Sequence, residues 1–195
     1  MLLEFLQKNR LSRKILERIA RRRAQDMINR IEKFFKKDDY ILDLGSGSCT
    51  VSDILLKKEY NIVSLDIQNL SLVNNLSPII YDGKNIPFKD NTFDKALIFT
   101  VLHHTQNPEE MLKKAKRVSK VIIIIEDIYL NWFHKYLTYF FDCLINLEFK
   151  GHPHTNKNDR EWKEVFNGLG LKLSYAHYDN SFVIFRHATY YLTKD

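Results

Sequence analysis

Short apolar runs alternate along the chain with segments in which apolar residues recur every three or four positions. The most apolar run, residues 121–126, is β-branched and of strand length. It predicts a strand buried on both faces of a parallel sheet. Six more runs have the composition of strands: 40–44, 61–66, 79–81, 93–100, 171–177 and 181–188. Between them we expect helices at 50–58, from about 69, at 108–118, 129–149 and 159–169.

Strands that alternate with helices are typical of an α/β protein with a doubly wound sheet and right-handed crossovers. The last two strands are separated by Asp179 and Asn180, which predict a turn and an antiparallel pair. We therefore expect a Rossmann-like sheet of seven strands, mostly parallel, with an antiparallel C-terminal strand. Because such sheets bind ligands at the carboxyl ends of their strands, functional residues should follow the first five strands.

Neither an internal repeat nor a linker divides the sequence, so we expect residues 1–195 to form a single domain. Within it, residues 1–37 would be an N-terminal helical extension and residues 128–158 a helical cap inserted after the fifth strand. The two cysteines, Cys49 and Cys143, form no metal-binding pair and favour a reducing compartment, hence a cytoplasmic protein. No apolar run approaches the roughly 20 residues of a membrane span.

The net charge of +6 is concentrated at the N-terminus. Residues 1–37 contain 12 Lys or Arg and 4 Asp or Glu, whereas the remainder has a slight acidic excess. Leu11, Ile15, Ile19 and Met27 recur there at helical spacing. The segment could be a lid over a binding site or an arm that holds nucleic-acid phosphates. We expect the lid, because a regular apolar stripe needs a surface to cover.

The first candidate site follows the first predicted strand. Gly45, Ser46 and Gly47 stand at the turn from this strand into a helix. Glycines let the backbone approach a ligand closely, and the helix start behind them presents N–H groups to a negative charge. Such turns are common, so the motif could also be no more than a tight turn.

An acidic residue at the end of the second strand strengthens the ligand interpretation. Asp66 comes 19 positions after Gly47 and is followed by Ile67. This spacing suits a carboxylate that accepts hydrogen bonds from ribose hydroxyls. The alternative is a surface or helix-capping aspartate. Together the two motifs indicate an adenosine-containing ligand, without deciding between NAD and S-adenosylmethionine (SAM).

The loop after the third strand carries Asp82 and Gly83, and Asn85-Ile-Pro-Phe88, Asn91-Thr-Phe-Asp94 and Leu102-His-His104 follow in order. From about residue 40 to 127 the sequence resembles the class I SAM-dependent methyltransferases, especially their small-molecule type. The resemblance implies SAM as cofactor and S-adenosylhomocysteine (SAH) as product, with Asp82 at the adenine amino group and Asp43 near the methionine amino group. Cys49 departs from the family, which usually has glycine there. The cofactor residues implied in this way are Asp43, Gly45, Ser46, Gly47, Asp66, Ile67, Asp82, Gly83 and Thr100.

The resemblance also implies the chemistry. The methyl group of SAM is electrophilic, so its transfer depends mainly on the alignment of a nucleophile. A base is needed only if the acceptor carries a proton. His103 and His104 follow the fourth strand and are the candidates, although they could simply shape the pocket or cap the next helix. We expect no metal, because scattered His and Asp residues mostly form hydrogen bonds.

The acceptor is expected to be a small molecule, methylated on O, C, N or S. The Asn-Pro-Pro-Tyr motif of enzymes that methylate amino groups is missing after the fourth strand. The insertion at 129–149 is rich in aromatic residues, which favours an apolar or planar acceptor. The open alternatives are a nucleic-acid methyltransferase and a non-catalytic SAM-binding protein. The candidate substrate residues are Glu126, Asp127, Trp132 and Asp142.

Overall fold

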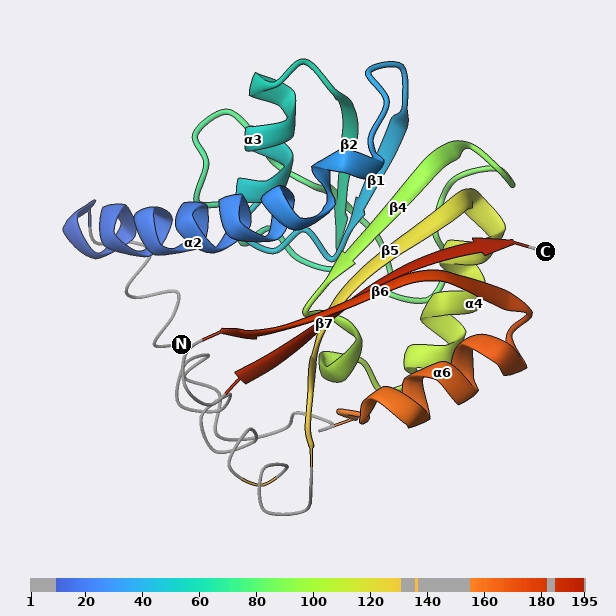
Figure 1. The fold of residues 1–195 in the computed structure, drawn as a ribbon. Helices are drawn as coiled ribbons and strands as arrows, with labels where there is room; N and C mark the ends of the chain where they lie inside the picture. The colour runs from blue at the N-terminus through green and yellow to red at the C-terminus, as the bar shows by residue number, and fades with distance from the viewer. Residues whose placement is uncertain (1–9, 131–135, 137–154, 182–184, 195) are drawn as a thin grey trace.

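A computed structural model describes residues 10–130, 136, 155–181 and 185–194. They form one seven-stranded sheet with strand order β3-β2-β1-β4-β5-β7-β6 (Figure 1). Neighbouring strands from β3 to β5 are parallel, and β7 is antiparallel to both β5 and β6. The expected Rossmann-like sheet with an antiparallel C-terminal strand is therefore confirmed. The strands are β1 (Tyr40–Leu44), β2 (Asn61–Asp66), β3 (Ile79–Ile80), β4 (Phe93–Phe99), β5 (Ser119–Ile128), β6 (Leu171–Ser181) and β7 (Phe185–Lys194).

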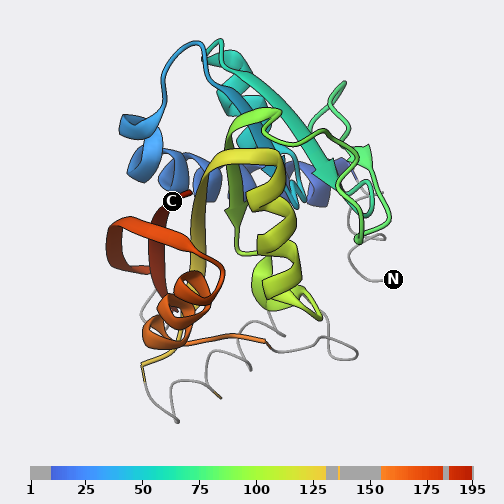
Figure 2. The ribbon, with the colours of Figure 1, turned by 90° about the vertical axis from the view of Figure 1, so that its right-hand side faces the viewer.

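Helices cover both faces of the sheet. Helices α2 (Arg10–Ile31) and α3 (Thr50–Lys57) pack on one face, and α4 (Pro108–Val118) and α6 (Asp159–Gly168) pack on the other (Figures 1 and 2). Two short 3-10 helices, η1 (Glu32–Phe34) and η2 (Leu102–His104), follow α2 and β4. Among the described residues, no helix combines the length and apolar composition needed to cross a bilayer.

Strand β5 shows why the sheet has two cores. Successive side chains of a strand point to opposite faces. Ile122 and Ile124 lie in the core beneath α4 and α6, whereas Ile123 and Ile125 lie in the core beneath α2 and α3. All four are essentially inaccessible to solvent. The β-branched run thus forms the predicted strand buried on both faces.

Two predicted elements are wrong. No helix begins near Asn69, because the described chain from Ile67 to Pro78 has no helical turn. Side chains bond the backbone there instead: Ser71 Oγ donates to the Leu76 carbonyl at 2.6 Å, and Asn69 Oδ1 accepts from the Ser71 amide. Such local bonds compete with helix formation.

The predicted turn at Asp179 and Asn180 is also wrong. Both residues lie inside β6, where they pair with His187 and Arg186 of β7. Ladder pairing therefore overrides their local preference for turns. The connection falls at 182–184, outside the described residues, and the last strand extends to Lys194 rather than to Ala188.

Helix α2 packs on the sheet through only part of its length. Its buried apolar residues are Ala24, Met27, Ile28 and Ile31, all in the C-terminal half. Near its middle, Thr50 Oγ1 of α3 donates to the Ala20 carbonyl at 3.5 Å. In its N-terminal half Leu11, Ile15 and Ile19 are exposed, so the predicted single stripe is divided between two surfaces.

Candidate cofactor and active site

The glycine loop connects β1 to α3 at the carboxyl edge of the sheet. Gly45 and Gly47 both have left-handed backbones, with φ of +77° and +48°. A Cβ on Gly45 would come within 2.6 Å of Val101 Cγ2, whereas a Cβ on Gly47 would meet nothing within 4 Å. The loop therefore packs tightly against the chain at Gly45 and faces open space at Gly47. Ser46 lies buried between them.

The backbone conformation of Cys49 explains why the methyltransferases that the sequence resembles usually have glycine at this position. It precedes α3 with φ of +57°, a left-handed conformation that costs a residue with a Cβ about 1 kcal/mol or more. Its amide donates to the Ser46 carbonyl at 2.8 Å, which closes the loop. Burial raises the pKa of its thiol. The side chain therefore acts as a small apolar group behind the loop.

Asp66 connects the glycine loop to the end of β2. Its Oδ2 accepts a hydrogen bond from the Gly47 amide at 2.7 Å, and its Oδ1 accepts from the Ile67 amide at 2.7 Å. The carboxylate is buried, and the Gln68 amide makes a third, longer bond of 3.3 Å. These contacts hold Asp66 beside Gly47 at the edge where a ribose would bind.

Asp82 and Gly83 lie in the loop after β3, next to Ile67. A Cβ on Gly83, whose φ is +72°, would be 3.2 Å from Ile67 Cγ2. Asp82 is exposed, and its Oδ1 accepts from the amides of Asn85 at 2.6 Å and Lys84 at 2.8 Å. These backbone bonds lower the pKa of Asp82. The exposed Ile67 side chain and this loop thus form an apolar surface beside a carboxylate.

A second carboxyl group lies beneath the glycine loop. Asp43 is fully buried and accepts a 2.7 Å hydrogen bond from Ser52 Oγ, which itself accepts from Ser64 Oγ at 2.7 Å. Burial, together with the nearby charge of Asp66, raises the pKa of Asp43 to about 6. A cation that binds next to Asp43 would stabilise its charged form.

His103 is held by Glu126 across the ends of β4 and β5. Its Nδ1 lies 2.6 Å from Glu126 Oε2, and both side chains are buried. Glu126 Oε1 accepts from the amides of Val101 at 2.8 Å and Leu102 at 2.7 Å. With Nδ1 donating to the carboxylate, the basic lone pair of His103 is on Nε2. Glu126 is thus a positioning residue for the loop and the imidazole.

The neighbours of His103 complete this edge. The His104 ring lies against the His103 ring, with centroids 3.9 Å apart. Thr100, the residue directly after β4, has φ of +51°, an outlier for a β-branched residue, and its amide donates to the Ile125 carbonyl at 2.7 Å. Backbone strain of this kind concentrates at functional sites.

Asp127 is not brought together with Glu126. Its side chain lies on the α2 side of the sheet, where Oδ1 is 2.8 Å from Nε2 of His187. Arg30 of α2 donates to His187 Nδ1 at 3.1 Å, which leaves the imidazole proton on Nε2, facing Asp127. Burial alone would raise the pKa of Asp127, but the contact with His187 lowers it overall. Trp132 and Asp142 lie outside the described residues.

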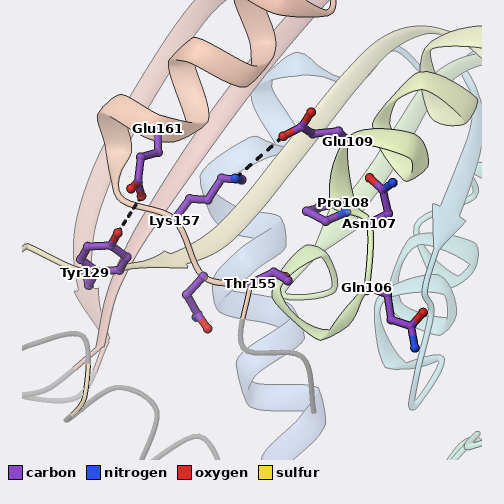
Figure 3. Close-up of a pocket in the computed structure, with 9 residues that line it drawn as sticks. Gln106, Asn107, Pro108, Glu109, Tyr129, Thr155, Lys157 and Glu161 are labelled. Atoms are coloured by element: carbon purple, nitrogen blue, oxygen red, sulfur yellow. Dashed lines mark hydrogen bonds and ion pairs between the residues drawn. The ribbon is translucent and has the colours of Figure 1, made fainter. Parts of the chain in front are cut away.

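A pocket of about 390 Å³ opens beside η2, between the start of α4, the end of β5 and the start of α6 (Figure 3). Across it Tyr129 Oη donates to Glu161 Oε2 at 2.7 Å, and Lys157 Nζ lies 3.9 Å from Glu109 Oε1. Of the predicted substrate residues that the structure describes, neither Glu126 nor Asp127 lines it. The lining residues are Gln106, Asn107, Pro108, Glu109, Tyr129, Thr155, Asn156, Lys157 and Glu161.

Two residues that sequence reasoning missed line this pocket, and one of them contacts the loop that carries His103. Thr155 Oγ1 lies 3.1 Å from the carbonyls of Leu102 and Thr105, so it holds the η2 loop. Asn156 is buried, and among the described groups its Oδ1 has no hydrogen-bond partner. An unpaired buried acceptor favours a ligand that brings a donor. Both residues lie near the end of the predicted cap insertion, 128–158, where no motif indicates their role.

The described residues fit SAM. Open space at the left-handed Gly47 would take a ligand without a clash, and Asp66 lies beside it. Asp43 is a buried carboxyl group suited to an ammonium, and the surface of Ile67 and Gly83 would suit a flat ring. No three metal-ligating side chains gather among the described residues.

Known proteins agree with this interpretation. Residues 42–121 match the family model described as a methyltransferase domain. An uncharacterized methyltransferase of Schizosaccharomyces pombe is 31% identical over 107 residues, which are 45% of this chain and 38% of that protein. The chain spans less than half the length of the curated relatives it matches.

Solved structures share the fold. A SAM-dependent methyltransferase from Methanosarcina mazei superposes with a TM-score of 0.66 at 20% identity, covering 84% of this chain and 96% of that one. Magnesium protoporphyrin IX methyltransferase from Synechocystis, with bound SAH, superposes with a TM-score of 0.65 at 12% identity, covering 97% of this chain and 89% of that one. Residues 42–121 thus match a methyltransferase-domain model, in agreement with the resemblance seen in the sequence, and the chain shares the fold of these solved methyltransferases.

The two loop glycines give a matched pair of tests. Gly45→Ala should lower the free energy of unfolding by about 3 kcal/mol, because left-handed strain adds to the overlap with Val101. Gly47→Ala should lower it by only about 1 kcal/mol, because its Cβ enters open space. Urea unfolding measures both, and calorimetry with SAH should show weakened binding to Gly47→Ala despite its small loss of stability. Equal losses of stability in the two variants would contradict the loop geometry.

Proposed function

We propose that this chain binds SAM along the carboxyl edge of β1, β2 and β4 and transfers its methyl group to a small-molecule acceptor. One observation carries the proposal: the left-handed Gly47 faces open space while its amide bonds Asp66 at the end of β2. This arrangement places a close backbone approach beside a carboxylate, which adenosine ligands require.

Each cofactor residue would contact a different chemical group of SAM. Asp66 would accept from the ribose hydroxyls, because its carboxylate has acceptor capacity beyond its backbone bonds. Asp82 would accept from the adenine amino group, with Ile67 and Gly83 against the ring. Asp43 would neutralise the methionine ammonium, and Thr100 would border the site at the end of β4. When bound, SAM supplies an electrophilic methyl group.

His103 is the proposed general base for an acceptor that carries a proton. Glu126 fixes its Nδ1 at 2.6 Å, which keeps the basic lone pair on Nε2 and stabilises the imidazolium after proton uptake. His104 packs against the same ring and would shape the pocket. An acceptor that carries no proton would use these histidines only for alignment.

The polar pocket beside η2 supports a small acceptor. Lys157, Asn156 and Glu109 line it, and Thr155 links it to the loop that carries His103. It would hold the polar end of the acceptor. The solved relative from Synechocystis is named for a small-molecule substrate, magnesium protoporphyrin IX, which supports the same class.

Contacts of α2 support the proposed lid at the N-terminus. Arg21 of α2 forms an ion pair with Asp53 in the first turn of α3. Arg13 Nη2 donates to the Leu72 carbonyl, in the loop after β2, at 3.4 Å. The extension therefore touches two segments that border the glycine loop.

The cofactor site is tested by calorimetry with SAH. Asp66→Ala and Asp82→Ala should each weaken SAH binding roughly ten-fold to a hundred-fold, because donors on the ligand lose their acceptor. Asp90→Ala, which removes an exposed carboxylate from the loop before β4, is the matched control and should bind normally. Unchanged affinity in both site variants would refute the assignment, and NADH binding tighter than SAH would refute the choice of cofactor.

A further inference from the structure

Helix α2 has two apolar faces. The first packs on the sheet through Met27, Ile28 and Ile31. The second consists of Leu11, Ile15 and Ile19, whose exposed fractions are 70%, 53% and 61%. Ile19 and Ile28 are nine residues apart, which is two and a half helical turns, so they lie on opposite sides of the helix. The second face therefore contributes nothing to the core.

Basic side chains are interleaved with this second face. Lys14, Arg18 and Arg22 are exposed, and each follows an apolar member by three residues, so the two sets are neighbours on the helix surface. We call these six residues the outer face of α2. Glu17 lies away from it, bonded to Arg21, and the exposed Asp26 comes one turn beyond Arg22. The outer face is thus apolar along its centre and positively charged beside it.

We propose that the outer face of α2 binds the surface of an anionic lipid membrane. Isoleucine and leucine side chains can enter the boundary of the acyl chains, while Lys14, Arg18 and Arg22 contact negative headgroups. A nucleic acid would satisfy the charges but would place the isoleucines against phosphates and sugars, where they gain little. Only a lipid surface would bind both the apolar and the basic side chains of the outer face.

The position of α2 suits such a surface. Its N-terminal half projects past the strands of the sheet (Figure 1), and Leu11, Ile15 and Ile19 are exposed there. In the same helix, Ala20 contacts Thr50, which begins α3 directly after the glycine loop. A membrane bound to α2 would therefore lie near the cofactor edge.

Vesicle flotation of the full chain tests the proposal. The protein should float with vesicles that contain phosphatidylserine, float much less with phosphatidylcholine alone, and be partly released by high salt. The double variant Ile15→Ser with Ile19→Ser should reduce the bound fraction at least ten-fold, and Arg18→Glu with Arg22→Glu should abolish binding. Matched controls are Leu56→Ser, an exposed apolar residue of α3, and Lys113→Glu with Lys172→Glu, which make the same change in net charge.

Both controls should float like the wild type, and all variants should bind SAH normally, which separates this test from that of the proposed function. The proposal is overturned if the protein does not bind anionic vesicles. It is also overturned if the serine variant floats normally while the glutamate variant does not. Tight, salt-sensitive RNA binding that survives the serine changes would assign the outer face to nucleic acid instead.

Discussion

Replacing Glu126 by alanine should cost about 4 kcal/mol of folding free energy, because three buried donors lose their acceptor at once. The amides of Val101 and Leu102 and the Nδ1 of His103 all bond this carboxylate. Urea or thermal unfolding measures the loss. Glu109→Ala, an exposed glutamate at the start of α4, should change stability by less than about 0.5 kcal/mol. A Glu126→Ala protein as stable as the wild type would contradict the buried network.

Glu126→Gln separates the catalytic consequence from the loss of stability. The amide oxygen can still accept from the two backbone amides, but the NH2 group would face His103 Nδ1 and move the ring proton to Nε2. The ¹⁵N shifts of the imidazole should report this tautomer change. Once an acceptor is in hand, Glu126→Gln and His103→Gln should each lower turnover roughly a hundred-fold or more, with SAH affinity nearly unchanged. Normal turnover in His103→Gln would reduce this histidine to a wall of the pocket.

Asp43→Asn is expected to stabilise the protein at neutral pH. The folded pKa of Asp43 is about 6, above the ordinary aspartate value of 3.8. Between these two values the folded state holds more protons than the unfolded state, so stability falls as pH rises from about 4 to 6 and stays lower above that. The variant should therefore gain about 3 kcal/mol at pH 8 and nothing near pH 4. Equal stability of both proteins at pH 8 would show that burial does not raise the pKa of Asp43.

The affinity for the cofactor should depend on pH in the opposite direction to stability, and should be higher where Asp43 is charged. An ammonium next to Asp43 binds its charged form, so the affinity of the wild type for SAH should fall up to ten-fold per pH unit below pH 6. Asp43→Asn should bind SAH weakly and without this pH dependence, a trade of binding for stability that is typical of functional sites.

The glycine loop, Asp66 and the core of β5 could be predicted from the sequence because each depends on local geometry. A β-branched apolar run fits a strand buried on both faces of the sheet. A strand-to-helix turn with two glycines fits a backbone that approaches a ligand closely. The spacing of Asp66 likewise follows from the length of one helix and one strand.

The rest depends on contacts between distant parts of the chain. Side-chain bonds of Ser71 replace the helix expected near Asn69, and pairing with β7 draws Asp179 into a strand. Glu126 and Asp127 are adjacent in sequence and were expected in one pocket, yet strand alternation sends them to opposite faces. Thr155 contacts the η2 loop from about 50 residues away in sequence, and no motif in the sequence indicates this contact. The prediction of a single apolar stripe along α2 is wrong, because the nine residues from Ile19 to Ile28 place these two side chains on opposite sides of the helix.

A crystal structure of the full chain with SAH tests the central claim most directly. It should show the ribose hydroxyls on Asp66, the adenine between Ile67 and the Asp82–Gly83 loop, and the homocysteine ammonium next to Asp43. The sulfur should face η2, on the side of His103 and the pocket lined by Asn156. SAH bound away from the Gly45–Gly47 loop, or with its sulfur turned away from η2, would contradict the proposed methyl transfer at this site.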